Sequence, residues 1–353
     1  MNETFDGEKR YGEKPMTQPV GVAMIGTGRW AGHMAQAVGR TDAIRIVSCF
    51  SRTRKNREQF ADTFECFASD SFEDAIHHPE VEAVVLTTPN MVHAEQTIEC
   101  ARARKHVFVE KPIAYSLKDC VKMAEICESI GVTLLVGHCF RRAGAARKIK
   151  QMLQEDLLGK VVLAEANFSF DSTGLTPDAW RYYKDQCPGG PLMQLGIHHV
   201  DTLHYLLGSV DQVRGSFAQL STHAEIDDVG AAILEFKQGT RAVITGSYVS
   251  PRTFFIRLFG SKGNLEYSVD MSNWRVSKMI DSMTTLTFQK EDTREEIAFT
   301  PNDMLVDELE EFAHCVRGET TPETGAAEGT AALKVILAAI ESHETGKAIS
   351  LEA

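Results

Sequence analysis

The feature that most constrains this chain is a glycine-rich turn between a short apolar stretch and a helical pattern. Residues 20–25 are apolar enough to form a buried strand, and Gly26-Thr27-Gly28-Arg29-Trp30-Ala31 follows at once. The first glycine permits a tight turn, the second lets a ligand approach the backbone, and a small third residue lets the helix pack on the strand. This turn predicts a parallel α/β sheet with a binding site where its first helix begins.

The pattern after this turn alternates between short apolar strands and helices. We expect strands at residues 20–25, 44–50, 81–87, 107–109 and 133–137, and helices beginning near residues 31, 55, 93 and 116. Such alternation is typical of a parallel sheet, because parallel neighbours need long helical crossovers. Residues 18–140 are therefore predicted to form a Rossmann domain. Residues 1–17 mix charge with Gly and Pro and are predicted to be a disordered leader.

The pattern changes after residue 140. One helix at residues 145–155 precedes strands at residues 161–170, 213–220, 230–236, 241–248 and 254–259, and a helix at residues 326–345 follows. Short links such as residues 237–240 predict hairpins and hence a mostly antiparallel sheet. The chain has 353 residues, which favours two domains at roughly 150 residues each. Residues 141–353 are predicted to be the second, α+β domain.

Composition limits the partners. The formal net charge of −12 disfavours nucleic acid and anionic membranes, because both attract a basic surface. No apolar run approaches the roughly 20 residues that cross a bilayer, so we expect a cytoplasmic protein. The cysteines lack the spacing of metal ligands, and we expect buried free thiols and no metal site.

Within this strand and helix setting, the glycine-rich turn predicts a dinucleotide site whose pyrophosphate meets the N-terminus of the first helix. The expected contacts in this turn are Gly26, Thr27, Gly28, Arg29 and Trp30. The second strand ends in Ser51-Arg52 and has no acidic residue to bind a ribose hydroxyl. A hydroxyl and a guanidinium suit the 2′-phosphate of NADP, so NADP is favoured; NAD remains possible if Arg52 only stacks on adenine.

Several motifs in order resemble the glucose-fructose oxidoreductase, inositol dehydrogenase and rhizopine-catabolism family, written Gfo/Idh/MocA. They are Gly26 to Ala31, Thr88-Pro89-Asn90 with His93, Glu110-Lys111-Pro112, Trp180-Arg181, and residues 189–201. The resemblance implies an open-faced sheet in the second domain, which binds substrate and forms homodimers or homotetramers. It also implies reversible oxidation of sugar or cyclitol hydroxyls. It adds cofactor contacts at Thr88, Pro89, Asn90, His93, Glu110, Lys111, Trp180 and Arg181.

Lys111 is the first candidate catalytic residue. It follows a strand end, where ligands of open α/β sheets gather, and the resemblance implies a cis bond to Pro112 that turns its ammonium towards the nicotinamide. The positive charge would stabilise the alkoxide that forms before hydride leaves.

Residues 191–207 are predicted to form a helix, with Pro191 in the first turn and Gly208 after the end. Gln194, His198 and Asp201 share one face of it. His198 is the candidate general acid and base, because imidazole titrates near neutral pH. Asp201 orients that imidazole, accepts a substrate hydroxyl or makes a structural hydrogen bond; the sequence leaves these roles open.

Gln194 departs from the family, which usually carries Asp at this position. An amide can hydrogen-bond a hydroxyl in both directions but is a poor proton acceptor. Proton transfer is thus expected to fall to Lys111 and His198, with a substrate other than inositol or the commonest aldoses. Arg141, Arg142 and Lys184 could hold a carboxylate or phosphate of the substrate, although some of them are expected to be solvated or to bind cofactor. Gly196 in mid-helix suggests that cofactor or substrate approaches the backbone there.

Two other functions stay open. One is a cofactor- or sugar-sensing regulator without turnover, against which the presence of both Lys111 and His198 argues. The other is a relative that cleaves glycosides through a tightly held NAD with no net oxidation. The phosphate-compatible Ser51-Arg52 pair fits that second function less well.

Overall fold

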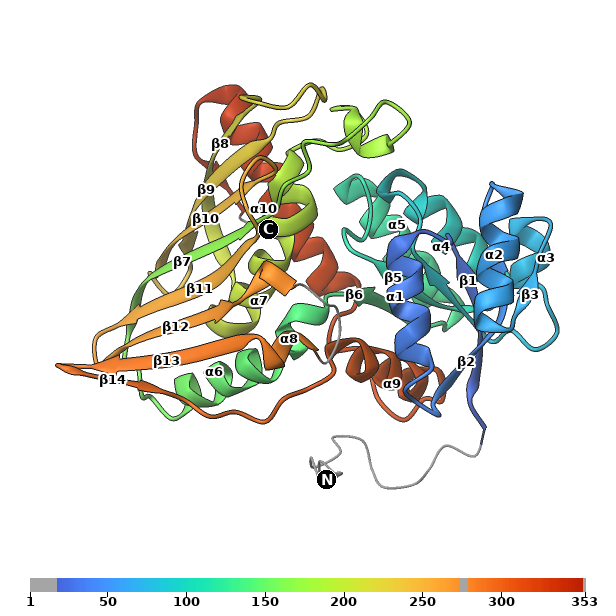
Figure 1. The fold of residues 1–353 in the computed structure, drawn as a ribbon, viewed down its shortest axis with the longest axis horizontal. Coiled ribbons are helices and arrows are strands. Elements are labelled where there is room, and N and C mark those ends of the chain that lie inside the picture. The colour runs from blue at the N-terminus through green and yellow to red at the C-terminus, as the bar shows by residue number, and fades with distance from the viewer. Residues whose placement is uncertain (1–17, 274–278, 352–353) are drawn as a thin grey trace.

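The computed structural model describes residues 18–273 and 279–351, so the predicted leader at residues 1–17 lies outside the described residues. Figure 1 shows two halves side by side. The smaller half, at the right, holds a sheet with helices around it, and the larger half is a broad, curved sheet with helices on the side that faces the first half.

The N-terminal half is a Rossmann domain. Its six strands run in the order β3-β2-β1-β4-β5-β6 and every neighbouring pair is parallel. The strands are β1 (Val20–Ile25), β2 (Ile44–Phe50), β3 (Phe67–Ala68), β4 (Ala83–Leu86), β5 (His106–Glu110) and β6 (Leu134–Gly137). The helices are α1 (Arg29–Val38), α2 (Arg54–Phe64), α3 (Phe72–Ile76), α4 (His93–Arg102) and α5 (Leu117–Ile130). The predicted fold class is confirmed for this half.

The strand order reverses direction at β1 and β4, and ligands of open α/β sheets bind outside the carboxyl ends of such strands. Every residue of β1 and β4 is buried, as expected for central strands covered on both faces. The short β3 and α3 were not predicted, because two residues carry no periodic signal and α3 is barely longer than one turn.

The C-terminal half is built on a nine-stranded sheet in the order β14-β13-β12-β11-β7-β10-β9-β8-β15. Its strands are β7 (Val161–Ser169), β8 (Val210–Ala218), β9 (Val229–Phe236), β10 (Arg241–Ser247), β11 (Thr253–Gly260), β12 (Asn264–Val269), β13 (Thr284–Lys290), β14 (Thr293–Glu296) and β15 (Ile349–Ser350). The sheet is mixed: most neighbours are antiparallel, but β7 and β10 are parallel. The prediction of a mostly antiparallel sheet is correct and omitted this parallel pair, which joins strands that no short turn connects.

Most helices of this half lie on the face of the sheet that is turned to the Rossmann half (Figure 1). The helices are α6 (Gly144–Gln154), the π-helical turn η4 (Leu192–Gly196), α7 (Ile197–Leu207), α8 (Met279–Ser282), α9 (Met304–Val316) and α10 (Ala326–Thr345). Helix α10 packs on β8 and α7 and also reaches α5 and β6, while α9 packs on α1 and β2. The chain therefore returns to the Rossmann half after residue 300. The predicted division at residue 140 does not include this return.

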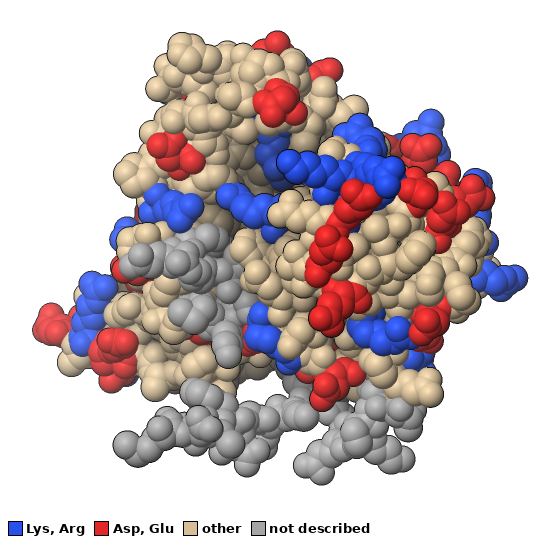
Figure 2. Space-filling model, turned by 45° about the vertical axis from the view of Figure 1, so that its right-hand side comes forward, with Lys and Arg blue, Asp and Glu red and all other residues tan. Residues whose placement is uncertain are grey.

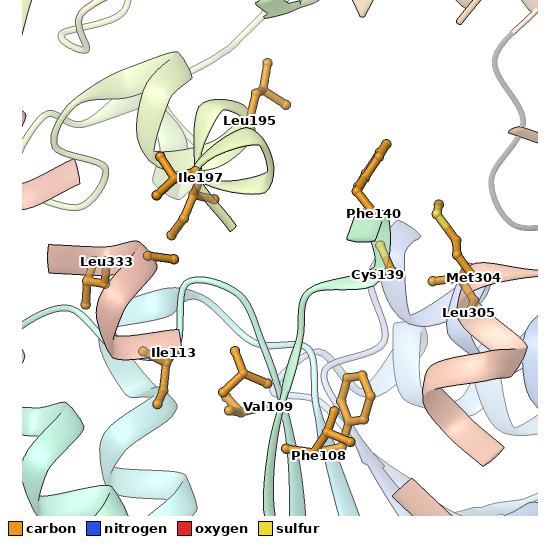
Figure 3. Close-up of a cluster of buried hydrophobic side chains, with 14 of the residues drawn as sticks. Phe108, Val109, Ile113, Cys139, Phe140, Leu195, Ile197, Met304, Leu305 and Leu333 are labelled. Atoms are coloured by element: carbon orange, nitrogen blue, oxygen red, sulfur yellow. The ribbon is translucent and has the colours of Figure 1, made fainter. Parts of the chain in front are cut away.

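A shared hydrophobic core holds the two halves together. Figure 3 shows buried side chains from β5, α9, α10 and the η4–α7 segment gathered where the two halves meet; they include Phe108, Val109, Ile197, Met304, Leu305 and Leu333. All of them are fully buried, with exposed fractions of 0%. This core fixes the carboxyl end of β5 against the helix that carries His198. Within residues 18–273 and 279–351, no helix is both long enough and apolar enough to cross a membrane.

Candidate active site

The glycine-rich turn leaves room for a ligand above helix α1. Gly26 has φ +89°, and a Cβ there would lie 2.9 Å from Thr87 Oγ1, so only glycine fits without strain. A Cβ on Gly28, by contrast, would meet no atom within 4 Å. Gly28 is also the N-cap of α1, and within the described residues no side-chain hydrogen bond caps this end of the helix. An open backbone beside unpaired helical N–H groups fits a pyrophosphate.

The end of β2 is exposed and basic. Thr27 Oγ1 donates to Ser51 Oγ at 2.7 Å, which ties the glycine-rich turn to the end of β2. Arg52 is exposed and makes no ion pair with the described residues, whereas nearby Arg54 is paired with Glu58 at 2.7 Å. Ser51 and Arg52 therefore present a hydroxyl and a guanidinium at the end of β2.

The buried side chain of His93 lies between Thr88 and Pro112. Its ring is fully buried, with Nδ1 lying 2.9 Å from the carbonyl oxygen of Pro112 and Nε2 lying 2.9 Å from that of Thr88. Burial lowers the pKa of His93. Both ring nitrogens face main-chain carbonyl oxygens, and the neutral ring can donate to one of them at a time. Since both nitrogens are turned to the chain, we reassign His93 from cofactor contact to a residue that positions the Lys111-Pro112 segment. Thr88, Pro89 and Asn90 lie beside it, after the carboxyl end of β4.

The Lys111-Pro112 peptide bond is cis, as the family resemblance implied. The preceding Glu110 is buried: its carboxylate accepts a hydrogen bond from Trp30 Nε1, and Oε2 lies 3.3 Å from the main-chain nitrogen of Lys111. Trp30 thereby links α1 to the end of β5. Burial raises the pKa of Glu110 to about 7, against the opposing effect of the Lys111 charge.

Lys111 reaches across to the other half of the molecule. Its Nζ donates to the main-chain oxygen of Gln194 at 2.9 Å. Gln194 lies in the π-helical turn η4, and π-helical turns interrupt the regular pairing of carbonyl oxygens in a helix. Burial lowers the pKa of Lys111, which Glu110 partly offsets and the charge of Arg181 reinforces. Lys111 and Gln194 are thus brought together, although the predicted continuous α-helix from residue 191 to 207 is wrong at its first turn.

His198 lies in the first turn of α7 in an aromatic setting. Its ring centroid is 4.5 Å from that of Phe140, and Nδ1 is buried without a hydrogen-bond partner among the described residues. Burial lowers the pKa of His198 well below its usual range, and the charge of Lys111 lowers it further. The ring is therefore neutral at physiological pH, which is the form that accepts a proton.

Asp201 has a structural partner that was not predicted. Arg141 Nε and Nη2 donate to its two carboxylate oxygens at 2.8 and 2.5 Å, and both residues are buried. His138 Nδ1 lies 3.8 Å from the same carboxylate. A carboxylate bound by both prongs of a guanidinium has little capacity left for a substrate, so of the roles left open, the structural hydrogen bond fits best. The only sign in the sequence of this buried cluster around Asp201 was the position of His138, just after β6.

Arg142 and Gly196 differ from their predictions. Arg142 is fully buried, and its guanidinium is paired with Asp307 and Glu311 of α9, so we remove it from the proposed substrate contacts. A Cβ on Gly196 would lie 2.8 Å from Leu192 Cδ2 and 3.6 Å from Ile244 Cγ2. Packing against Leu192 therefore favours glycine at 196.

Trp180 and Arg181 form the short helical turn η3 (Trp180–Tyr182) at the mouth of the site. The Arg181 guanidinium lies 4.4 Å from the centroid of the Trp180 ring, and its Nε is 3.4 Å from Gln194 Oε1. Figure 2 shows a hollow between the two halves with Lys and Arg side chains gathered around it. The site is therefore lined by cations where the halves meet.

Comparisons with known proteins agree with this geometry. Residues 20–138 match the oxidoreductase family with an NAD-binding Rossmann fold, and residues 146–266 match the GFO/IDH/MocA C-terminal domain. A solved structure from Desulfitobacterium hafniense dcb-2, assigned as an NADPH-dependent oxidoreductase, is 36% identical with a TM-score of 0.91 and covers 95% of this chain and 98% of its own. The chain belongs to the Gfo/Idh/MocA family. It is an NAD(P)-dependent oxidoreductase with the two-part architecture of that family.

Two curated relatives align with most of this Gfo/Idh/MocA protein. The D-xylose 1-dehydrogenase [NADP(+)] of Haloarcula marismortui is 26% identical over 99% of this chain and 98% of its own length. The 2,7-anhydro-N-acetylneuraminate hydratase of Escherichia coli K12 is 27% identical over 78% of this chain and 74% of its own length. The family thus includes relatives named for oxidation and one named for hydration.

Proposed function

We propose that this protein is an NADP-dependent dehydrogenase that transfers a hydride between nicotinamide and a secondary hydroxyl or ketone of a sugar, cyclitol or sugar derivative. The observation that carries the proposal is the meeting of Lys111 with the η4–α7 segment, at the carboxyl end of β5 and beside a neutral His198. The name of the Haloarcula relative supports sugar oxidation and NADP.

A nicotinamide cofactor held at the glycine-rich turn and the end of β5 would supply the acceptor for the hydride of the carbon that carries the reacting hydroxyl. His198, neutral because it is buried, takes the hydroxyl proton. Lys111 supplies positive charge to the oxygen as its proton leaves, and its bond to the Gln194 carbonyl holds the ammonium in place. In the reduction direction the same residues return the proton. Gln194 contributes an amide for hydrogen bonding and no base.

Different surfaces would hold the two ends of the cofactor. The pyrophosphate would lie over Gly28 and the N-terminus of α1, where space and unpaired N–H groups are present. Ser51 and Arg52 would bind the 2′-phosphate, since the end of β2 has a free guanidinium and no acid. These contacts make NADP the preferred cofactor, with NAD as the weaker one.

We also propose that the protein acts in the cytoplasm as a homodimer or homotetramer built on the open face of the nine-stranded sheet. Val162 and Ile233 are exposed large hydrophobic residues on strands β7 and β9 of that sheet. The cysteines are all free, and all but one are buried, which is typical of proteins in a reducing compartment.

A substrate panel tests the function. Purified protein is incubated with NADP⁺ or NAD⁺ and a set of sugars, cyclitols and sugar acids, and reduced cofactor is measured by absorbance. Steady formation of NADPH with at least one sugar is expected. Sugar binding with no turnover in either direction would indicate a sensing protein, and product formation without net reduced cofactor would indicate the glycoside-cleaving alternative.

A further inference from the structure

Two free cysteines lie in contact at the outer edge of the Rossmann sheet. Cys49 is in β2, and Cys66 directly precedes β3, the edge strand that pairs with β2 beside helix α2 (Figure 1). In the parallel register of these strands, Cys49 lies opposite Ala68, which comes two residues after Cys66. Side chains two residues apart in an extended segment share a face, so Cys49 and Cys66 lie on the same face. A hydrogen bond joins their side chains.

The two thiols differ in exposure and in acidity. Cys49 is fully buried, whereas Cys66 is half-buried and reaches solvent. The hydrogen bond between them lowers the pKa of Cys66 and, together with burial, raises the pKa of Cys49. The thiolate is the nucleophilic form of cysteine. Cys66 is therefore the thiol that a small oxidant reaches and reacts with first, and Cys49 is placed to react with the product.

A second pair of cysteines shows what an unreactive pair looks like in the same domain. Cys100 of α4 and Cys127 of α5 are both buried, and these two helices pack on each other. Burial raises the pKa of both thiols, that of Cys127 to about 11. Buried thiols with raised pKa values are inert. We therefore expect Cys100 and Cys127 to stay reduced under conditions that oxidise Cys49 and Cys66.

The reactive pair is linked to the segment proposed to bind the 2′-phosphate. Cys49 Sγ lies 3.4 Å from the main-chain oxygen of Arg57. The guanidinium of Arg57 turns back to the end of β2, where Nη1 lies 3.4 Å from the main-chain oxygen of Ser51, and its Nη2 donates to Asp70 Oδ1 at 2.7 Å. A displacement of Cys49 therefore reaches Ser51 and Arg52 through Arg57 as well as along the strand.

We propose that Cys49 and Cys66 form a reversible oxidation site, in which a low-molecular-weight disulfide converts them to an intramolecular disulfide that weakens NADP binding at Ser51 and Arg52. The effect on NADP rests on the proposed function, whereas the oxidation site does not. A disulfide brings two sulfur atoms closer than a hydrogen bond does. β3 is a two-residue edge strand with Phe67 58% exposed, so it can move towards β2.

The chemistry is thiol–disulfide exchange in two steps. The Cys66 thiolate attacks one sulfur of the small disulfide, which forms a mixed disulfide and releases the other half as a thiolate. Cys49 then attacks Cys66 Sγ and releases the second half, and the protons of the two cysteines pass to the released thiolates. Two protein thiols thus lose two electrons, and the small disulfide is reduced to two thiols. In a reducing compartment such a bond is transient and forms when the oxidant accumulates.

Peptide mapping tests the oxidation site. Purified protein is incubated with oxidised glutathione, its remaining thiols are alkylated, and the digest is analysed by mass spectrometry. We expect a peptide pair linked through Cys49 and Cys66 that dithiothreitol separates. Cys100 and Cys127 should be recovered alkylated.

Fluorescence titration tests the effect on the cofactor. The Kd for NADP⁺ should rise about fivefold or more in the oxidised protein and return to its first value after dithiothreitol. Cys66→Ala should bind NADP⁺ like the reduced wild-type protein, with or without oxidised glutathione. Cys127→Ala is the matched control: it removes one thiol from the buried pair and should keep the wild-type response to oxidation.

Three results would overturn the inference. Cys66 that carries only glutathione, or that is linked to a cysteine other than Cys49, would contradict the oxidation site. A Cys49–Cys66 link that leaves the Kd for NADP⁺ unchanged would contradict its effect on the cofactor, and so would an equal rise of that Kd in oxidised Cys66→Ala. If the reduced protein binds neither NADP⁺ nor NAD⁺, the proposed function fails, and the peptide map still decides whether the oxidation site exists.

Discussion

The ammonium of Lys111 and the main-chain oxygen of Gln194 are joined by a 2.9 Å hydrogen bond that crosses from the end of β5 to the turn before α7. This bond connects the two halves of the molecule where the Rossmann strands end. It also sets Lys111 beside His198, whose pKa the Lys111 charge lowers.

Replacing Lys111 by Met should lower kcat by about a hundredfold or more and leave the Kd for NADP⁺ within about threefold. The side chain supplies charge to the reacting oxygen and is not part of the pyrophosphate site. Lys105→Met is the control, because Lys105 lies before the other end of β5 and its Nζ bonds to Val81. Lys111→Met with wild-type kcat would show that Lys111 is not catalytic.

The pH profile should identify His198 as the base. Burial lowers the pKa of His198, so the neutral ring persists below pH 6.5, the ordinary histidine value. For sugar oxidation, kcat/KM should therefore stay level as pH falls to 6.5 and decline only below it. His198→Gln should remove both this acidic limb and most of the rate.

Glu110 is the competing explanation for an acidic limb, since burial raises its pKa to about 7. Glu110→Gln should keep a limb below pH 6.5 if His198 is the base. A limb centred near pH 7 in the wild type that disappears in Glu110→Gln would assign the titration to Glu110 instead.

Arg52→Gln should weaken binding of NADP⁺ by about tenfold and that of NAD⁺ much less, because only NADP⁺ carries the 2′-phosphate. Arg54→Gln removes an equal charge two residues away, where the guanidinium is already paired with Glu58, and should change neither affinity greatly. Fluorescence titration of each variant with NADP⁺ and with NAD⁺ measures the two affinities. Equal losses for the two cofactors in Arg52→Gln would contradict a phosphate contact.

Asp201→Asn should lower the free energy of unfolding by about 3 kcal/mol, because the buried Arg141 loses its charged partner. The double variant Arg141→Met with Asp201→Leu should recover most of that loss, since it removes both buried charges. Glu266→Gln, which breaks a surface pair with Arg257 at 3.3 Å, should cost less than about 1 kcal/mol. Unchanged stability in Asp201→Asn with a raised KM would return Asp201 to the substrate.

The sequence predicted the Rossmann half well because its signals are local. The strands at residues 20–25 and 44–50 and the glycine-rich turn lie where they were expected. β13 and β14 carry largely polar or exposed residues at the edge of the sheet, so no periodicity marked them. The π-helical turn at Gln194 was missed for a different reason: it depends on packing against the sheet and on Lys111, which no local pattern records.

The roles of single residues were harder to predict than the motifs. Arg142 follows Arg141 directly in the chain, yet one guanidinium binds Asp201 and the other enters a cluster with Asp307 and Glu311. Neighbouring residues of equal charge cannot be told apart by spacing, since their partners lie far away in the sequence. Both side chains are buried, and their carboxylate partners distinguished the two roles once the fold was known.

The central claim is that hydride leaves a sugar carbon at the site formed by Lys111 and His198. The most direct measurement is a single-turnover reaction with NADP⁺ and a substrate found in the panel, prepared with deuterium at every carbon-bound position. Mass spectrometry should find one deuterium in the NADPH made by the wild-type protein and almost none with Lys111→Met that still binds NADP⁺. Conversion of the sugar with no deuterium in released NADPH, or undiminished transfer by Lys111→Met, would contradict the account.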